Sequence, residues 1–254
     1  MTACAMRRDT EARCARRRRP LAALVLLLWC AAAAAQVGQL PQPLPGAVAD
    51  AAGEAFAGAP APAYVGGSAA FDFPRDPAVT RRVQQQLVAA AARENPAVRD
   101  ELDRIVSSGA VLREFDELLS RHGHSPRNLV DVMAAYFLIA WEVVNDRDSN
   151  DNPIGQAAVR RQLLGTMSGN PLLDLDPQAR QEMGETLALS AMIAGSVFHE
   201  LKRRGETAQV RQLQDGVHRV VLEQTGIDLR RMALTDGGLV ATGSGAARIP
   251  APPR

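Results

Sequence analysis

Residues 132–141, with the sequence VMAAYFLIAW, decide the fold of this chain. None of these ten side chains is charged, so a helix built from them is apolar on every side. Such a helix is stable only when it is buried on every side. Ten residues are also far fewer than the roughly 20 that a membrane-spanning helix needs. The segment therefore predicts a central, fully buried helix around which the rest of a soluble domain packs.

Helix starts recur on both sides of this segment. Asp, Asn or Ser directly before proline is typical of a capped helix start, because proline suits the first helical position. Apolar residues then follow at three- and four-residue spacing, as one face of a helix requires. We expect an all-α fold, a single bundle of about six to seven helices with no convincing strand. The five starts are Asp76-Pro77, Asn95-Pro96, Ser125-Pro126, Asn152-Pro153 and Asp176-Pro177.

The two flanks of the predicted bundle differ from it in composition. Residues 36–70 are rich in proline, alanine and glycine, and residues 241–254 are similar. Segments of this kind bury too little apolar surface to offset the entropy lost on ordering. We expect a disordered linker over 36–70, a helical domain over 71–240 and a disordered tail over 241–254. Within the domain, Leu234 and Leu239 are expected to pack back on the bundle.

The first 35 residues have the organisation of a secretory signal peptide. Four arginines, residues 16–19, precede fifteen uncharged and mostly apolar residues, 21–35. The small side chains of Ala33 and Ala35 fit the requirement of a signal peptidase. We therefore expect cleavage between Ala35 and Gln36, and a mature protein that is periplasmic or secreted.

Two other fates of this leader stay open. Cys30 is a candidate for lipid modification, although Trp29 stands where a small residue is needed. The leader is also a candidate for an uncleaved anchor, although its apolar run is shorter than a spanning helix needs. Translation from Met6 in place of Met1 leaves a functional leader in every case.

Removal of the leader changes the charge and the redox chemistry of the chain. The whole chain has 29 basic and 28 acidic residues, and residues 1–35 hold seven arginines and two acids. The remainder has 22 basic and 26 acidic residues, a formal charge of −4. All three cysteines also lie in the leader, so the mature chain has no thiol. A mildly acidic surface argues against a nucleic-acid partner and against strong attraction to anionic lipid. We expect no stable membrane insertion after cleavage.

Histidines give the first candidates for a metal site. His122 and His124 flank a glycine and offer two imidazoles, a weak set of ligands unless carboxylates join them. His199 and Glu200 begin the zinc-protease pattern H-E-x-x-H, but Arg203 stands where its second histidine is required. The sequence therefore predicts no metalloprotease, and it leaves His122 and His124 as candidate ligands.

A polar loop gives the second candidate. Asp146, Asp148 and Asn150 match positions one, three and five of an EF-hand calcium loop. Asp151 replaces the glycine of position six, and Ala157 replaces the bidentate glutamate of position twelve. Half of the calcium-binding pattern is thus present. The alternative interpretation of the same residues is a solvated loop that connects two capped helices.

Several local features of residues 71–239 together carry a family resemblance. They are the Asp76-Pro77 helix start, Phe115-Asp116 before a turn, the apolar helix of residues 129–141, the helix break Arg203-Arg204-Gly205-Glu206 and the closing Leu234-Thr235-Asp236-Gly237-Gly238-Leu239. With them the domain resembles a family of uncharacterised secreted bacterial helical proteins, a domain of unknown function. The family has no assigned activity, so the resemblance implies no catalytic residue and no cofactor.

Three classes of function remain open. The first is a non-enzymatic helical domain that binds a protein or envelope partner through a groove between helices. The second is a small-ligand or metal-binding module that uses the bundle interior or the end near His122 and His124. The third is an enzyme of unfamiliar type. A deep pocket with converging polar groups favours the second or third class, and a solid core favours the first.

The leader generates one direct prediction. Mass spectrometry of the exported chain is expected to find Gln36 at the N-terminus, because peptidase cleavage follows the small side chains of Ala33 and Ala35. An intact leader, or a lipid attached to Cys30, would contradict this prediction.

Overall fold

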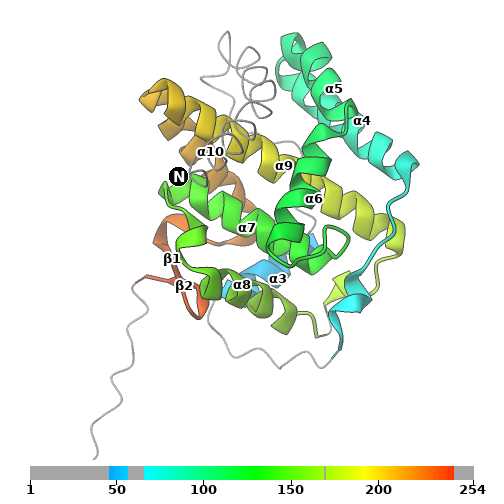
Figure 1. The fold of residues 1–254 in the computed structure, drawn as a ribbon, viewed down its shortest axis with the longest axis vertical. Coiled ribbons are helices and arrows are strands. Elements are labelled where there is room, and N and C mark those ends of the chain that lie inside the picture. The colour runs from blue at the N-terminus through cyan, green and yellow to red at the C-terminus, as the bar shows by residue number, and fades with distance from the viewer. Residues whose placement is uncertain (1–45, 57–65, 169, 243–254) are drawn as a thin grey trace, which may run out of the picture.

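The computed structural model describes residues 46–56, 66–168 and 170–242 (Figure 1). The predicted signal peptide, with its cleavage site at Ala35 and Gln36, lies outside the described residues. So do most of the predicted linker and all but two residues of the predicted tail. No helix in the described ranges has the length and apolar character needed to cross a membrane.

Eight α-helices dominate the described residues, which confirms the all-α class. One of the eight was not expected, and a two-stranded hairpin ends the domain. The helices are α3 (Gly46–Phe56), α4 (Pro77–Glu94), α5 (Arg99–Ser107), α6 (Ala110–Arg121), α7 (Leu129–Asn145), α8 (Pro153–Gly165), α9 (Pro177–Arg204) and α10 (Thr207–Thr225), and the strands are β1 (Met232–Thr235) and β2 (Gly238–Ala241).

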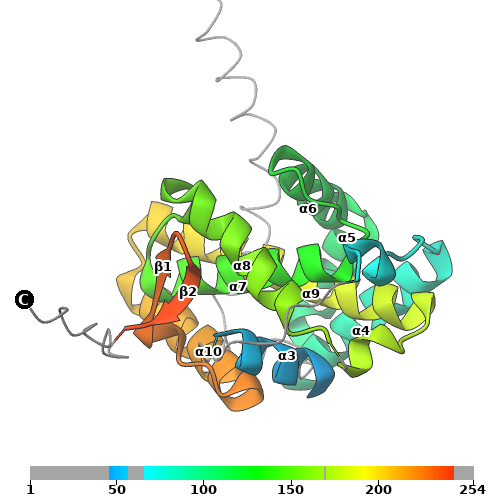
Figure 2. The ribbon, with the colours of Figure 1, turned by 90° about the horizontal axis from the view of Figure 1, so that it is seen from below.

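Helix α7 contains the uncharged segment and lies at the centre of the bundle (Figures 1 and 2). Thirteen of its 17 residues are buried. It packs most closely against α9, α8 and α10. Phe137 is fully buried and makes edge-to-face contacts with Phe56 at 5.4 Å and with Tyr136 at 5.2 Å. The prediction of a buried central helix is confirmed.

Four of the five predicted caps start a helix. Asp76, Asn152 and Asp176 each accept a hydrogen bond from a backbone N–H of the first turn, at 2.7–2.8 Å. Asn95 caps a short 3-10 turn that leads into α5. The start at Ser125 is wrong, because α7 begins at Leu129 with Asn128 as its cap.

The prediction that residues 36–70 are wholly disordered is wrong for α3. Val48, Ala51, Ala52 and Phe56 are buried, and they recur at the spacing of one helix face. That face packs against α10 and α8 (Figure 2). Small alanine side chains allow close packing here, so a segment of low apolar content still gains enough contact to stay ordered.

The expectation of no strands is also wrong at the end of the domain. Strands β1 and β2 pair antiparallel across the two-residue turn Asp236-Gly237, a sequence typical of a hairpin. The Gln162 side chain donates to the Leu239 carbonyl and accepts from the Leu239 N–H, both at 3.0 Å. Leu239 is fully buried and Leu234 packs against the core, as expected.

A buried ionic cluster fixes the extended segment before α4. The Glu185 carboxylate, with 1% of its side chain exposed, accepts hydrogen bonds from Thr80 at 2.9 Å and Gln181 at 3.0 Å. Arg75 lies 3.2 Å from the same oxygen and also donates to Asp116 at 3.0 Å. Burial raises the pKa of Glu185 above its ordinary value, against the opposing effect of these partners.

Two glycines of α8 give a matched test of the hairpin contact. A Cβ at Gly155 would lie 2.5 Å from the Thr235 carbonyl oxygen, whereas one at Gly165 meets nothing within 4 Å. Gly155→Ala is therefore expected to lower the free energy of unfolding by about 1–3 kcal/mol. Gly165→Ala is expected to leave it unchanged or slightly raised, as measured by urea denaturation. Equal effects of the two substitutions would contradict the close approach of β1 to α8.

The ionic cluster predicts a pH effect. Because the pKa of Glu185 is raised in the folded state, the folded protein binds this proton more tightly than the unfolded chain. This contribution favours folding below the ordinary pKa of 4.5 and is lost as the pH rises through the folded value. Glu185→Gln is expected to lose less stability than the unmodified protein as the pH rises from 4.5 to neutral. Parallel pH profiles in urea denaturation would contradict this.

Candidate functional site

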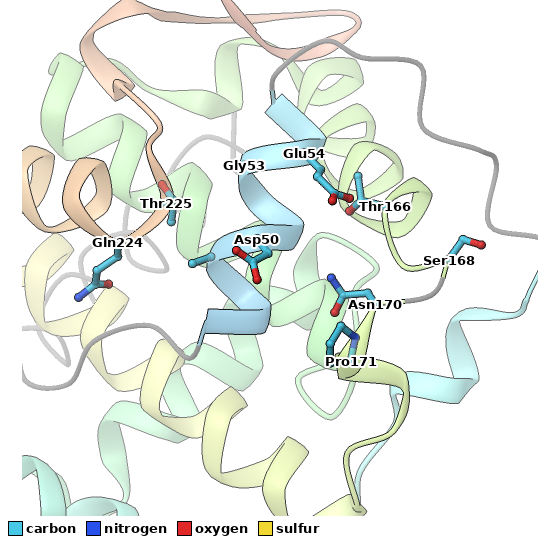
Figure 3. A pocket seen from close by; sticks show the side chains of 10 residues that line it. Asp50, Gly53, Glu54, Thr166, Ser168, Asn170, Pro171, Gln224 and Thr225 are labelled. Atoms are coloured by element: carbon cyan, nitrogen blue, oxygen red, sulfur yellow. The ribbon is translucent and has the colours of Figure 1, made fainter.

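A polar pocket of about 490 Å³ lies where α3 passes between the C-terminal ends of α8 and α10. Figure 3 shows α3 in the middle, with Gln224 and Thr225 on one side and Thr166 and Ser168 on the other. Three segments far apart in the sequence thus supply its walls. The volume lies in the range of pockets that bind small molecules.

Close backbone contacts fix the walls of this pocket. A Cβ at Gly53 would lie 3.1 Å from the Thr225 carbonyl oxygen, so glycine lets α3 approach the end of α10. The Thr166 hydroxyl is buried and lies 3.1 Å from the Ala51 carbonyl oxygen and 2.8 Å from that of Leu163. It thereby joins α3 to the C-terminal cap of α8.

Two carboxylates line the pocket. Asp50 and Glu54 lie one turn apart on α3, and both are exposed. Neither makes a hydrogen bond or ion pair with another described residue. The buried carboxylates of the described chain are arranged differently, since each one has arginine beside it. These pairs are Asp131 with Arg160, Glu185 with Arg75, and Glu200 with Arg203 and Arg204.

A second, smaller cavity of about 100 Å³ forms a groove between α6 and α7. Its apolar wall includes Leu118, Ala135 and Ile139, which are partly exposed. His122 and His124 line one end. Burial lowers the pKa of His124, and the positive charge of Arg160 acts in the same direction against Asp131.

Hydrogen bonds close the polar end of this groove. The backbone N–H of Ser149 donates to Glu142 at 2.9 Å, and the Ser149 hydroxyl also contacts that carboxylate. Gln156 donates to the Ser149 hydroxyl oxygen at 2.8 Å. Ser149 is buried and belongs to the 3-10 turn η4 (Ser149–Asp151). These contacts join the loop after α7 to the first turns of α8.

The structure brings together only part of the predicted metal ligands. His122, His124 and Asn150 line the same groove. Asp146 pairs instead with Lys202, and Asp148 accepts from the backbone N–H of Asn150 at 2.9 Å as the cap of η4. Among the residues that the structure describes, no three or more His, Cys, Asp or Glu side chains are grouped as metal ligands would be.

Sequence reasoning missed the pocket at α3 because it assigned Asp50 and Glu54 to a disordered linker. The signal was the helical spacing of Val48, Ala52 and Phe56, with both acids on the other side. Nothing in the sequence indicates that α3 meets the ends of α8 and α10. That contact joins residues more than 100 positions apart.

Comparison with known proteins gives a family but no relative of known activity. No curated protein and no solved structure matches the chain. A family model with the description "Family of unknown function (DUF6683)" matches residues 59–242. The match covers α4 to α10 and the hairpin, and it begins after α3. This coverage is well over half of the chain, so the protein belongs to the DUF6683 family.

Proposed function

We propose that this protein is an exported, non-enzymatic module that binds a small ligand in the pocket beside α3. The proposal depends on one observation, an open pocket of about 490 Å³ that is lined mostly by polar side chains from three separate segments. Pockets that bind small molecules have volumes in this range. The proposal therefore places the protein in the second class of function left open by its sequence.

The engagement of two of the three pocket hydroxyls, those of Thr166 and Thr225, supports binding in preference to catalysis. Thr166 is bonded to backbone carbonyls, and the Thr225 hydroxyl donates to the Val221 carbonyl at 2.7 Å. A nucleophilic hydroxyl needs a general base within hydrogen-bond reach. Both threonine hydroxyls direct their protons at backbone carbonyl oxygens and not at a carboxylate of the pocket.

Export is the second part of the proposal. It rests on the arginine block, the apolar run and the small residues of the leader, with cleavage between Ala35 and Gln36. The proposed location is the periplasm or the exterior, where a mature chain without cysteine needs no disulfide chemistry.

A protein or envelope partner is a second candidate function, favoured by the groove between α6 and α7. Leu118, Ala135 and Ile139 present partly exposed apolar surface there, and His122 with Asn150 marks the polar ends. An amphipathic helix is the kind of partner that such a groove accepts. The cavity of about 100 Å³ has room for about one side chain, much less than the pocket beside α3 offers.

The pocket predicts a response that one substitution removes. Ser168 is exposed at its edge, so Ser168→Trp is expected to narrow the mouth of the pocket and leave the core intact. A thermal-shift screen with cationic, neutral and anionic small molecules is expected to yield ligands that raise the Tm of the unmodified protein by several degrees. The same ligands are expected to have little effect on Ser168→Trp.

Ser107→Trp is the matched control, because Ser107 is exposed at the far end of α5. Its ligand response should equal that of the unmodified protein. A screen in which no compound raises the Tm, or in which Ser168→Trp responds equally, would overturn the proposed function.

A further inference from the structure

Among the described residues, the pocket beside α3 is lined by two carboxylates and by no basic side chain. Asp50 and Glu54 are separated by four positions on one helix, an arrangement in which like charges repel. Glu54 also lies in the last turn of α3, where the helix dipole already disfavours a negative charge. The last turn of α3 contains no basic residue to relieve this.

The ends of two further helices add to this negative potential. Thr166 is the C-cap of α8, and Gln224 and Thr225 are the last residues of α10. All three line the pocket (Figure 3). A helix C-terminus carries the equivalent of about half a negative charge. The pocket therefore combines two carboxylates with the negative ends of α8 and α10.

Within the described residues, little around the pocket compensates for this charge. No lysine, arginine or histidine is among the described lining residues. The sequence from residue 36 to residue 74 contains none either, so the segments that flank α3 cannot supply one. The turn η5 (Pro171–Leu173) begins at the pocket, but its Leu172 N–H already donates to the Asn170 side chain at 2.9 Å.

The size and chemistry of the site select an organic cation over a metal ion. Two carboxylates fall short of the three or more ligands that usually hold a metal in a protein. The volume of about 490 Å³ is also much larger than an ion. An ammonium offers three N–H donors and a guanidinium five, which suits the carboxylate, hydroxyl and amide oxygens around the pocket.

We infer that the pocket binds an organic cation through a primary ammonium or guanidinium group, held between Asp50 and Glu54. This inference rests on the proposed function and names the chemical class of its ligand. Both a free amine and the side chain of a basic peptide present this group. Because the family match begins after α3, the preference for cations belongs to a part of the chain outside that match.

Isothermal titration of the exported protein tests the inference with four probes. Butylammonium and butylguanidinium are the free cations, and a blocked peptide with a central arginine represents a peptide source. Butanol is the neutral control. We expect the cations to bind and butanol not to bind. We also expect affinity to fall as the ionic strength rises from about 0.01 M to about 0.15 M, because exposed charges are screened.

Substitutions that remove one negative charge locate the site. Asp50→Asn and Glu54→Gln are each expected to weaken cation binding about tenfold, the usual effect of losing one charged hydrogen-bond partner. Glu223→Gln removes an exposed charge from the last turns of α10 without altering the pocket lining, and it should bind as the unmodified protein does. Circular dichroism confirms that each variant folds, which is expected because all three side chains are exposed.

The outcomes separate the inference from the function on which it rests. Cation binding that survives the double substitution Asp50→Asn, Glu54→Gln would overturn the inference. So would ligands in the thermal-shift screen that are neutral or anionic and blocked by Ser168→Trp, although these would support the proposed function. No response to any compound would overturn both. Tighter binding of the peptide than of the free amines, or the reverse, supports the inference and identifies the source of the cation.

Discussion

The burial of most of α7, 13 of its 17 residues, is the constraint on which the rest of the structure depends. A helix without a polar face must be covered along its whole length, and its neighbours must satisfy the polar groups that it carries. The Trp141 indole N–H donates to the Met232 carbonyl at 3.0 Å, and Asn145 donates to the Leu229 carbonyl at 3.1 Å. Gln214 of α10 donates in turn to the Val143 carbonyl at 3.0 Å. The central helix thus helps to fix the end of the domain, together with the contacts of Gln162 of α8 with Leu239.

The candidate site is a consequence of the same requirement. Phe56 of α3 packs on Phe137 of α7, so α3 takes part in covering the central helix. Its apolar face is used in this way, and its acidic face is left at the surface between the ends of α8 and α10. A helix that contributes to the core thereby brings two carboxylates to a place where other helix ends already meet.

Local sequence signals predicted most of the helices. A helix start marked by Asp or Asn before proline depends only on residues that are adjacent in the sequence. The helix start predicted at Ser125 was wrong because Asn128 caps α7 instead. The Asn128 side chain accepts a hydrogen bond from the Asp131 N–H. The hairpin was missed because each strand has four residues, too few to display a clear alternation. Helix α3 was missed because alanine contributes little to measures of hydrophobicity. The pocket was beyond prediction, because it depends on how distant helix ends meet and not on any local pattern.

The carboxylates of the described chain fall into two groups. Buried carboxylates are paired with arginine and stabilise the fold, whereas exposed ones without a partner are available to bind a ligand. A buried carboxylate that loses its partner costs several kcal/mol, so natural folds place arginine beside it, as here for Asp131 and Glu185. An exposed pair such as Asp50 and Glu54 bears no such cost, because water solvates both groups in the absence of a ligand. Their repulsion is nevertheless unfavourable, and a bound cation relieves it while it gains two charged hydrogen bonds. In the complex that we infer, the same pair that weakens α3 slightly on its own would contribute to holding the cation.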